Sequence, residues 1–144
     1  MIAAHHLRFM QQLGRSYRAL VAGFETRTGQ SMARWRILLM LHKAGEISQK
    51  AMARELAINP AALTRQLKGL ESQRLVTRHN DANDARLINV TLTEAGREVV
   101  LSTMERRNDF IEWALGDFTE AELEGLSDML LKLETRLSGS GEAQ

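Results

Sequence analysis

The sequence predicts a mainly α-helical fold, and three observations support this. The chain has 144 residues, of which 44% are hydrophobic, so one domain can bury a sizeable core. It has one Pro and 5% aromatic residues, which fits helices better than a sandwich of short strands. Apolar residues recur three or four positions apart along most of the chain, and they alternate only between residues 75 and 92.

Two helices are predicted before Gly45. The first carries one apolar stripe and ends near Gly29, because Gly can serve as a C-cap. Ser31 can cap the second helix, which is too continuously apolar around Trp35 to lie on a surface and closes at Gly45. The stripe of the first helix consists of Leu7, Met10, Leu13, Tyr17, Leu20 and Phe24.

A short third helix leads into a fourth. After a link at Glu46 and Ile47, Ser48 can cap the third helix, which stops before Pro60. Asn59 is then an N-cap acceptor, and Pro60 takes the first helical position, where no amide hydrogen is needed. The apolar residues of these two helices are Met52, Leu56 and Ile58 in the third and Leu63, Leu67 and Leu70 in the fourth.

The next segment predicts a β-hairpin, because its hydrophobic period changes from about 3.6 to 2. Residues 75–79 and 87–92 are the expected strands, and the polar residues 80–85 between them are turn material. This hairpin therefore has a polar tip.

Two more helices are predicted after the hairpin. Thr93 opens the first of them, without the Glu three positions later that a capping box needs. The last helix presents a narrow leucine seam, which is suited to a partner helix or else belongs to the core of this chain. The residues from Ser138 onward are expected to fray. The seam consists of Leu123, Leu126, Leu130, Leu133 and Leu137.

A short helix, a turn, a second helix with a cationic outer face and a two-stranded hairpin follow one another, which is the order of a winged helix-turn-helix. The helix that begins at Pro60 fits the major groove of DNA, where its polar side chains can reach base edges and its small residues permit close approach. The alternative for the cations is that they are solvated surface residues. The candidate base-reading or close-contact residues are Ala61, Ala62, Thr64, Arg65 and Gln66, and the candidate phosphate contacts are Lys68, Arg78 and Lys50.

Arg86 is predicted to enter the minor groove from the hairpin. The negative potential of a narrow minor groove attracts such a cation. Asp84 can hold the Arg86 guanidinium in a bidentate pair, which would also stabilise the turn, and the two roles are compatible.

Charge is distributed unevenly along the chain. Residues 1–30 carry four basic and one acidic side chain, for a net charge of +3, and residues 31–97 carry eleven and six, for +5. Residues 98–144 carry four and eleven, for −7, so the total of +1 conceals a basic body and an acidic C-terminal region. A basic body is compatible with a polyanionic partner.

The run of residues from Leu56 to Gly96 resembles the MarR family of bacterial transcription regulators. The resemblance implies a homodimer whose N- and C-terminal helices interlock and whose two winged modules read a palindromic DNA site. It also implies residues 1–30 as an N-terminal dimerisation helix, 31–97 as the winged module and 98–144 as C-terminal dimerisation helices. The resemblance is carried by Leu63-Thr64-Arg65, Leu70-Glu71, Leu75-Val76-Thr77-Arg78, Asp81, Asp84, Arg86 and Val90-Thr91-Leu92-Thr93-Glu94-Ala95-Gly96.

Two departures from the family pattern are visible. The tip of the hairpin has Ala82, Asn83 and Ala85 where many relatives have Pro and further Arg, so the wing is poorer in charge. Arg74 stands where many relatives have Gly, so either a residue other than Gly takes a positive φ or the turn differs.

The resemblance further implies a repressor that a small aromatic acid or phenol releases from DNA. Such a ligand needs an apolar wall and one cation, and Trp35 with Arg18 could supply them. The alternative is that Trp35 is core and Arg18 is surface.

Several other function classes find no support. The chain has no Cys, which excludes disulfides and thiol chemistry, and no His pair has the spacing of a metal site. No phosphate loop, activated Ser or other catalytic constellation is present, so we expect neither an enzyme nor a cofactor. No long apolar run predicts a membrane span, and the expected compartment is the cytoplasm. The remaining alternative is a winged helix used as a protein-interaction module without sequence-specific DNA binding.

Overall fold

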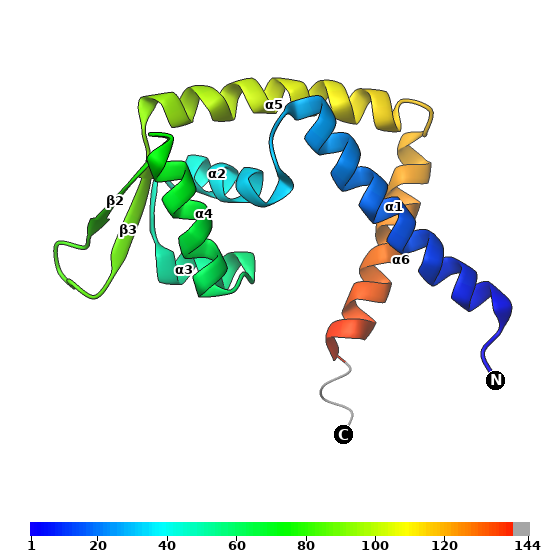
Figure 1. The fold of residues 1–144 in the computed structure, drawn as a ribbon. Helices are drawn as coiled ribbons and strands as arrows, with labels where there is room; N and C mark the ends of the chain where they lie inside the picture. The colour runs from blue at the N-terminus through cyan, green and yellow to red at the C-terminus, as the bar shows by residue number, and fades with distance from the viewer. Residues whose placement is uncertain (140–144) are drawn as a thin grey trace. The chain divides into compact units, whose positions relative to one another are not determined.

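The computed structural model describes residues 1–139, and these confirm the mainly helical winged helix-turn-helix (Figure 1). The predicted fraying falls mostly on residues 140–144, which lie outside the described residues. The helices are α1 (Ala4–Thr28), α2 (Met32–Ala44), α3 (Gln49–Leu56), α4 (Pro60–Ser72), α5 (Glu94–Leu115) and α6 (Glu120–Ser138), and the strands are β1 (Glu46–Ser48), β2 (Val76–Asn80) and β3 (Ile88–Leu92).

The helices begin where the sequence places hydrogen-bond acceptors. The Ser31 side chain accepts from the Arg34 N–H group, and Ser48 Oγ accepts from the Ala51 N–H group at 3.1 Å. At the start of α5, Thr93 Oγ1 accepts from the Gly96 N–H group at 3.0 Å. α6 starts with a full capping box between Thr119 and Glu122, which the sequence analysis did not predict.

The predicted hairpin forms, but the sheet has a third strand. The link expected at Glu46 and Ile47 is instead β1, which pairs antiparallel with β3 and places Glu46 opposite Thr91. Three residues are too short to show an alternating pattern, so only the tertiary pairing identifies this strand. The strand order is β1-β3-β2, with β3 in the centre.

The third helix also ends two residues earlier than its apolar pattern implies, at Leu56 and not at Ile58. Ala57 takes a left-handed conformation with φ 52°, which places Ile58 outside α3.

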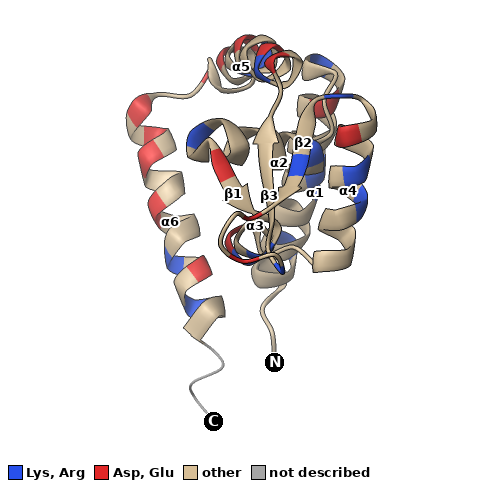
Figure 2. Ribbon diagram, turned by 90° about the vertical axis from the view of Figure 1, so that its left-hand side faces the viewer, with Lys and Arg blue, Asp and Glu red and all other residues tan. Residues whose placement is uncertain are grey.

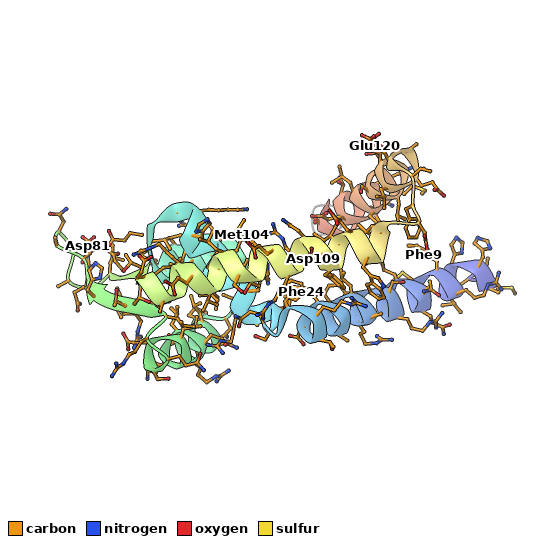
Figure 3. All side chains as sticks on the ribbon, turned by 90° about the horizontal axis from the view of Figure 1, so that it is seen from above. Phe9, Phe24, Asp81, Met104, Asp109 and Glu120 are labelled. Carbon is orange, nitrogen blue, oxygen red and sulfur yellow. The ribbon has the colours of Figure 1, made fainter. Side chains whose placement is uncertain are left out.

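The core lies between α2, α3, α4, the sheet and the first part of α5. Phe24 joins the C-terminal end of α1 to this core: its ring is 6.3 Å from that of Trp35 and 6.2 Å edge-on from that of Phe110 (Figure 3). The almost fully buried side chains include Ile37, Leu38, Leu41, Met52, Leu63, Leu67, Leu70, Val76, Val90 and Val100.

The chain divides into two compact units, Met1–Phe110 and the residues from Ile111 onward. In the first unit, most of the apolar stripe of α1 is exposed, including Leu7, Met10, Tyr17 and Leu20. In the second unit, α6 has no buried residue within the described chain. The division into residues 1–30, 31–97 and 98–144 by dimerisation role stays a prediction.

Gly96 is expected to tolerate no side chain. A Cβ atom added there would lie 2.1 Å from the Leu75 backbone oxygen, which itself accepts the Thr93 N–H group. Gly96→Ala is therefore expected to lower the free energy of unfolding by about 2 kcal/mol or more in urea denaturation. Gly69→Ala is the matched control, because nothing lies within 4 Å of its Cβ position and Ala favours a helix. Equal stability of the two variants would contradict this reading of Gly96.

Candidate nucleic-acid interface

A tight turn sets α4 against α3. The Ala57 N–H group donates to the Arg54 carbonyl at 3.2 Å and the Ile58 N–H group to the Ala53 carbonyl at 3.0 Å, which closes α3. Asn59 Oδ1 then accepts from the N–H group of Ala61 at 2.8 Å, which starts α4. These local hydrogen bonds fix where the second helix of the motif points.

One side of α4 is buried and the other is free. Leu63, Leu67 and Leu70 lie in the core, as predicted. Arg65 and Lys68 are exposed, and their positions in the sequence place them on the opposite side of the helix. Neither forms an ion pair within the described part of the chain, so both cations are available to a partner.

The other candidates on α4 differ in exposure. Ala61 is exposed, whereas Ala62, Thr64 and Gln66 are half-buried at the flanks of the helix. Thr64 Oγ1 donates to the Pro60 carbonyl at 3.0 Å and lies 3.4 Å from the Gln49 amide nitrogen, so its hydroxyl is partly engaged within the protein.

The loop between β2 and β3 is organised by Asp81, which Figure 3 labels at the wing. Its carboxylate accepts from the Asn89 amide at 2.8 Å and from the N–H groups of Asn83 and Asp84 at 2.9 and 3.0 Å. These hydrogen bonds, the one from Asn89 most of all, hold the pKa of Asp81 below its ordinary value. The sequence alone marks Asp81 only as part of the family pattern.

Removing the Asp81 carboxylate is expected to loosen the wing. In Asp81→Ala, the amide protons of Asn83 and Asp84 should exchange faster with solvent, because they lose their acceptor. The ionised form is the one bound, so wing order in the wild-type protein should persist above the ordinary pKa of Asp and be lost as the pH falls through the lowered pKa. Unchanged exchange at both amides would contradict this role.

Asp84 and Arg86 form the predicted bidentate pair. The Arg86 Nε–H and Nη2–H groups donate to the two Asp84 oxygens at 3.1 and 3.2 Å, and the Arg86 backbone N–H group donates to Asp84 Oδ1 at 3.0 Å. The Arg86 side chain, through its hydrogen bonds first of all, keeps the pKa of Asp84 below its ordinary value. That side chain is 91% exposed, so the pair orients the guanidinium without covering it.

Arg78 is mostly buried, whereas a side chain that contacts a phosphate needs to be exposed. Its side chain is only 18% exposed, and it donates to Glu71 Oε1 at 3.0 Å and to Gln49 Oε1 at 3.2 Å. Its hydrogen bond to Glu71 also lowers the pKa of that carboxyl group. Arg78 therefore ties β2 to α3 and α4, and we propose a positioning role in place of the predicted phosphate contact.

Gln49 is a residue that sequence analysis missed. It contacts both Thr64 and Arg78, which are 15 and 29 positions away in the chain. No local sequence pattern signals contacts at such separations.

The structure brings candidates from three elements to one groove of about 280 Å³. Lys50 of α3, Thr64 of α4 and Arg86 of the wing all line it. The expected nucleic-acid surface is thus continuous from α4 to the wing.

Comparison with known proteins places this arrangement in a family. The MarR family model matches residues 31–88. The uncharacterized HTH-type transcriptional regulator YdgJ of Bacillus subtilis (strain 168) is 35% identical over 115 residues, which are 80% of this chain and 70% of YdgJ. The chain belongs to the MarR family. This MarR-family chain is therefore a transcriptional regulator rather than an enzyme.

Solved MarR-family structures share the fold. A mutant of MarR from E. coli, complexed with operator DNA, is 20% identical with a TM-score of 0.82, and the match covers 90% of this chain and 95% of that one. BpsR of Bordetella bronchiseptica, whose DNA binding is regulated by 6-hydroxynicotinic acid, is 24% identical with a TM-score of 0.77 over 88% of this chain and 98% of BpsR. At these identities the likeness establishes the shared fold.

In this MarR-family chain Arg74 takes a positive φ, which is the first of the two possibilities that the sequence allows for it. It takes a positive φ of 60°, so the turn keeps the backbone that Gly would adopt. The Arg74 N–H group donates to the Glu71 carbonyl at 2.9 Å, and the Arg74 carbonyl accepts from the Thr93 hydroxyl at 2.6 Å. These hydrogen bonds hold a conformation that is uncommon for a residue with a Cβ atom.

The MarR-family chain does not bring Arg18 and Trp35 together within the described residues. Trp35 is 4% exposed and packs against Phe24, with the Arg107 guanidinium 5.7 Å from its ring centroid. Arg18 is exposed on α1, and no hydrogen bond or ring contact joins it to Trp35. In a single chain the tryptophan is core and the arginine is surface.

Residues 1–139 hold neither a candidate metal cluster nor a candidate membrane-spanning helix. No group of three or more His, Cys, Asp or Glu side chains there is arranged to hold a metal ion. None of the helices in the same residues is long and apolar enough to span a membrane.

Proposed function

We propose that this MarR-family regulator binds double-stranded DNA sequence-specifically, with α4 in the major groove and Arg86 of the wing in the minor groove. The observation that carries the proposal is that both α4 and the wing of the motif present exposed cations. Arg65 and Lys68 lie on the free side of α4, and Arg86 projects from the wing while Asp84 orients it. A helix and a hairpin arranged in this way can follow adjacent grooves of B-DNA.

The residues of the surface take different roles in this proposal. Arg65 reads base edges, because its guanidinium can donate two parallel hydrogen bonds to guanine. Lys68 and Lys50 neutralise phosphates. The remaining contacts come from Ala61, Ala62, Thr64, Gln66 and the Asp84–Arg86 pair.

The regulator is proposed to act as a homodimer on a palindromic operator. Exposed apolar side chains recur along α1 and α6, among them Tyr17 at 62%, Met129 at 64% and Leu131 at 59%. Apolar helix faces of this extent need a partner in water. A second copy supplies one and places two α4 helices about 34–36 Å apart, the spacing of successive major grooves.

Repression and ligand release form the finer part of the proposal. A protein bound over a promoter blocks access to it, and a small aromatic acid or phenol that favours a different spacing of the two α4 helices would release it. The regulation of BpsR by 6-hydroxynicotinic acid, in a protein of the same fold, supports an aromatic acid as the class of ligand.

The alternative is a winged helix that docks a protein. Such a surface would more often present exposed large apolar side chains. None of the exposed large hydrophobic residues of the described chain lies on α4. The cationic face therefore favours DNA.

The decisive experiment measures binding of the full chain to the duplex upstream of its own gene as salt is raised, with the mass of the complex followed by light scattering. Affinity should fall steeply with salt, because each neutralised phosphate releases counterions. The mass should correspond to two chains per duplex. A flat salt response, or equal affinity for the upstream duplex and a random one, would overturn sequence-specific DNA binding.

A further inference from the structure

A groove between α2 and α3 lies outside the proposed DNA surface. Its volume is about 440 Å³, which is in the range of pockets that hold small organic molecules. It belongs neither to α4 and the wing nor to the exposed stripes of α1 and α6. Its main lining residues are Arg36, Leu39, Met40, Lys43, Glu55 and Leu56.

The groove combines an apolar floor with two cations at its edge. Leu39, Met40 and Leu56 supply the floor, and Arg36 and Lys43 supply the cations. Among the described residues, no ion pair joins either cation to Glu55 or to another carboxylate. With Glu55 also in the lining, two cations and one carboxylate leave the groove a net charge of +1, which one carboxylate of a ligand can balance.

Arg36 also connects this groove to the DNA-binding motif. Its Nη2–H group donates at 2.9 Å to the carbonyl of Leu56, the last residue of α3. That carbonyl is at the end of a helix, where no partner within the helix remains for it. Ala57, which opens the turn into α4, follows directly.

We propose that this groove binds a small apolar monocarboxylate, whose carboxylate pairs with Arg36 and Lys43 while its apolar part packs on Leu39, Met40 and Leu56. A charge-assisted hydrogen bond to a carboxylate is stronger than one to a neutral carbonyl, so the ligand competes with Leu56 for Arg36. The turn before α4 then loses its tie to α2, and the orientation of α4 is free to change. This coupling step rests on the proposed DNA binding; the binding of the acid does not.

The binding is tested on the full chain without DNA, by calorimetric titration with 3-phenylpropionate and by amide shifts in ¹H–¹⁵N spectra. Saturable binding is expected, with the largest shifts at Arg36, Lys43, Leu56 and Ala57. The neutral 3-phenylpropionamide should bind at least tenfold more weakly, because it cannot balance the two cations.

Three variants locate the site. Arg36→Gln and Lys43→Gln should each weaken binding of 3-phenylpropionate at least tenfold. Arg54→Gln is the matched control on α3: it removes an exposed positive charge that does not line the groove, and it should bind as the wild type does. Arg36→Gln also removes the hydrogen bond to Leu56, so Lys43→Gln, which breaks no hydrogen bond or ion pair among the described residues, keeps the test valid if the first variant folds poorly.

The results separate the two proposals. No saturable binding, equal binding of the amide, or binding that both variants leave unchanged would overturn the site. If the acid binds in the groove yet the affinity for the upstream duplex is the same with and without it, the coupling through Arg36 is overturned. If the protein without acid prefers no duplex, the proposed function fails, while the titration still decides the groove.

Discussion

Arg65→Ala is expected to weaken binding to the specific duplex by about 1–3 kcal/mol and to relax the sequence preference at one base pair. Arg65 lies on the free side of α4, opposite the buried Leu63 and Leu67, so its side chain points away from the core. It has no ion pair among the described residues that would have to break before it reaches a base. Stability should change little, because the side chain is exposed. Fluorescence anisotropy on the upstream duplex, with each base pair varied in turn, measures both effects.

Lys68→Ala is the comparison for Arg65, because it removes one positive charge from the same exposed face. A phosphate contact should be lost about equally on specific and random duplexes, and the salt slope should fall by about 1. If Arg65→Ala behaves in the same way as Lys68→Ala, Arg65 is a phosphate contact and does not read bases.

Arg86→Ala is expected to weaken binding about tenfold, equivalent to about 1.4 kcal/mol, even on DNA whose major-groove contacts are intact. The guanidinium is 91% exposed and is held in place by Asp84, so it is oriented before DNA arrives. An oriented side chain loses less conformational entropy on binding. The loss should be largest on duplexes with A-tracts beside the α4 site, because their minor groove is narrow and strongly negative.

Two variants accompany Arg86→Ala. Asp84→Asn keeps the size of the side chain but removes the charge that orients Arg86, so its loss should be smaller and should fall on the same duplexes. Arg97→Ala removes an arginine that also pairs with a nearby carboxylate, that of Glu94, but it lies at the start of α5 and donates to the Leu92 carbonyl, at the end of β3 that is farther along the chain from Arg86. It should bind as the wild type does. Wild-type affinity of Arg86→Ala would leave the Asp84 pair as a purely structural contact.

The charge distribution agrees with this assignment of surfaces. The net positive charge lies in residues 1–97, whereas α6 carries acidic residues along much of its length (Figure 2). Glu120 and Glu122 also lie in the first turn of α6, where their negative charges interact favourably with the positive end of the helix dipole. A region with a net charge of −7 is repelled by phosphates, which favours contact through the winged module.

Much of this protein could be predicted from sequence because the decisive interactions are local. Ser31, Ser48 and Asn59 each cap a helix through N–H groups two or three positions further along. The Asp84–Arg86 pair spans two positions, and the hairpin strands lie next to each other in sequence. Interactions of this range depend on residue type and spacing, and both can be read directly from a sequence.

Other features required the tertiary structure. β1 is a strand only because Glu46, Ile47 and Ser48 meet β3, and Arg78 is held within the fold only because folding brings Gln49 and Glu71 to it. The sequence is compatible with two conformations of the turn at Arg74, and the hydrogen bonds around Arg74 hold the one with a positive φ.

By itself, then, the sequence determined the order of the helices, the position of the wing and the elements that carry the cations, since each is encoded within a few residues. The tertiary structure decided which cations are free and which are used in the fold. Arg65 and Arg86 have the same charge as Arg78 and Arg36, but the latter two are bound by groups 7–29 positions away in the chain. Packing between distant segments determines those neighbours, and no local pattern of residues specifies them.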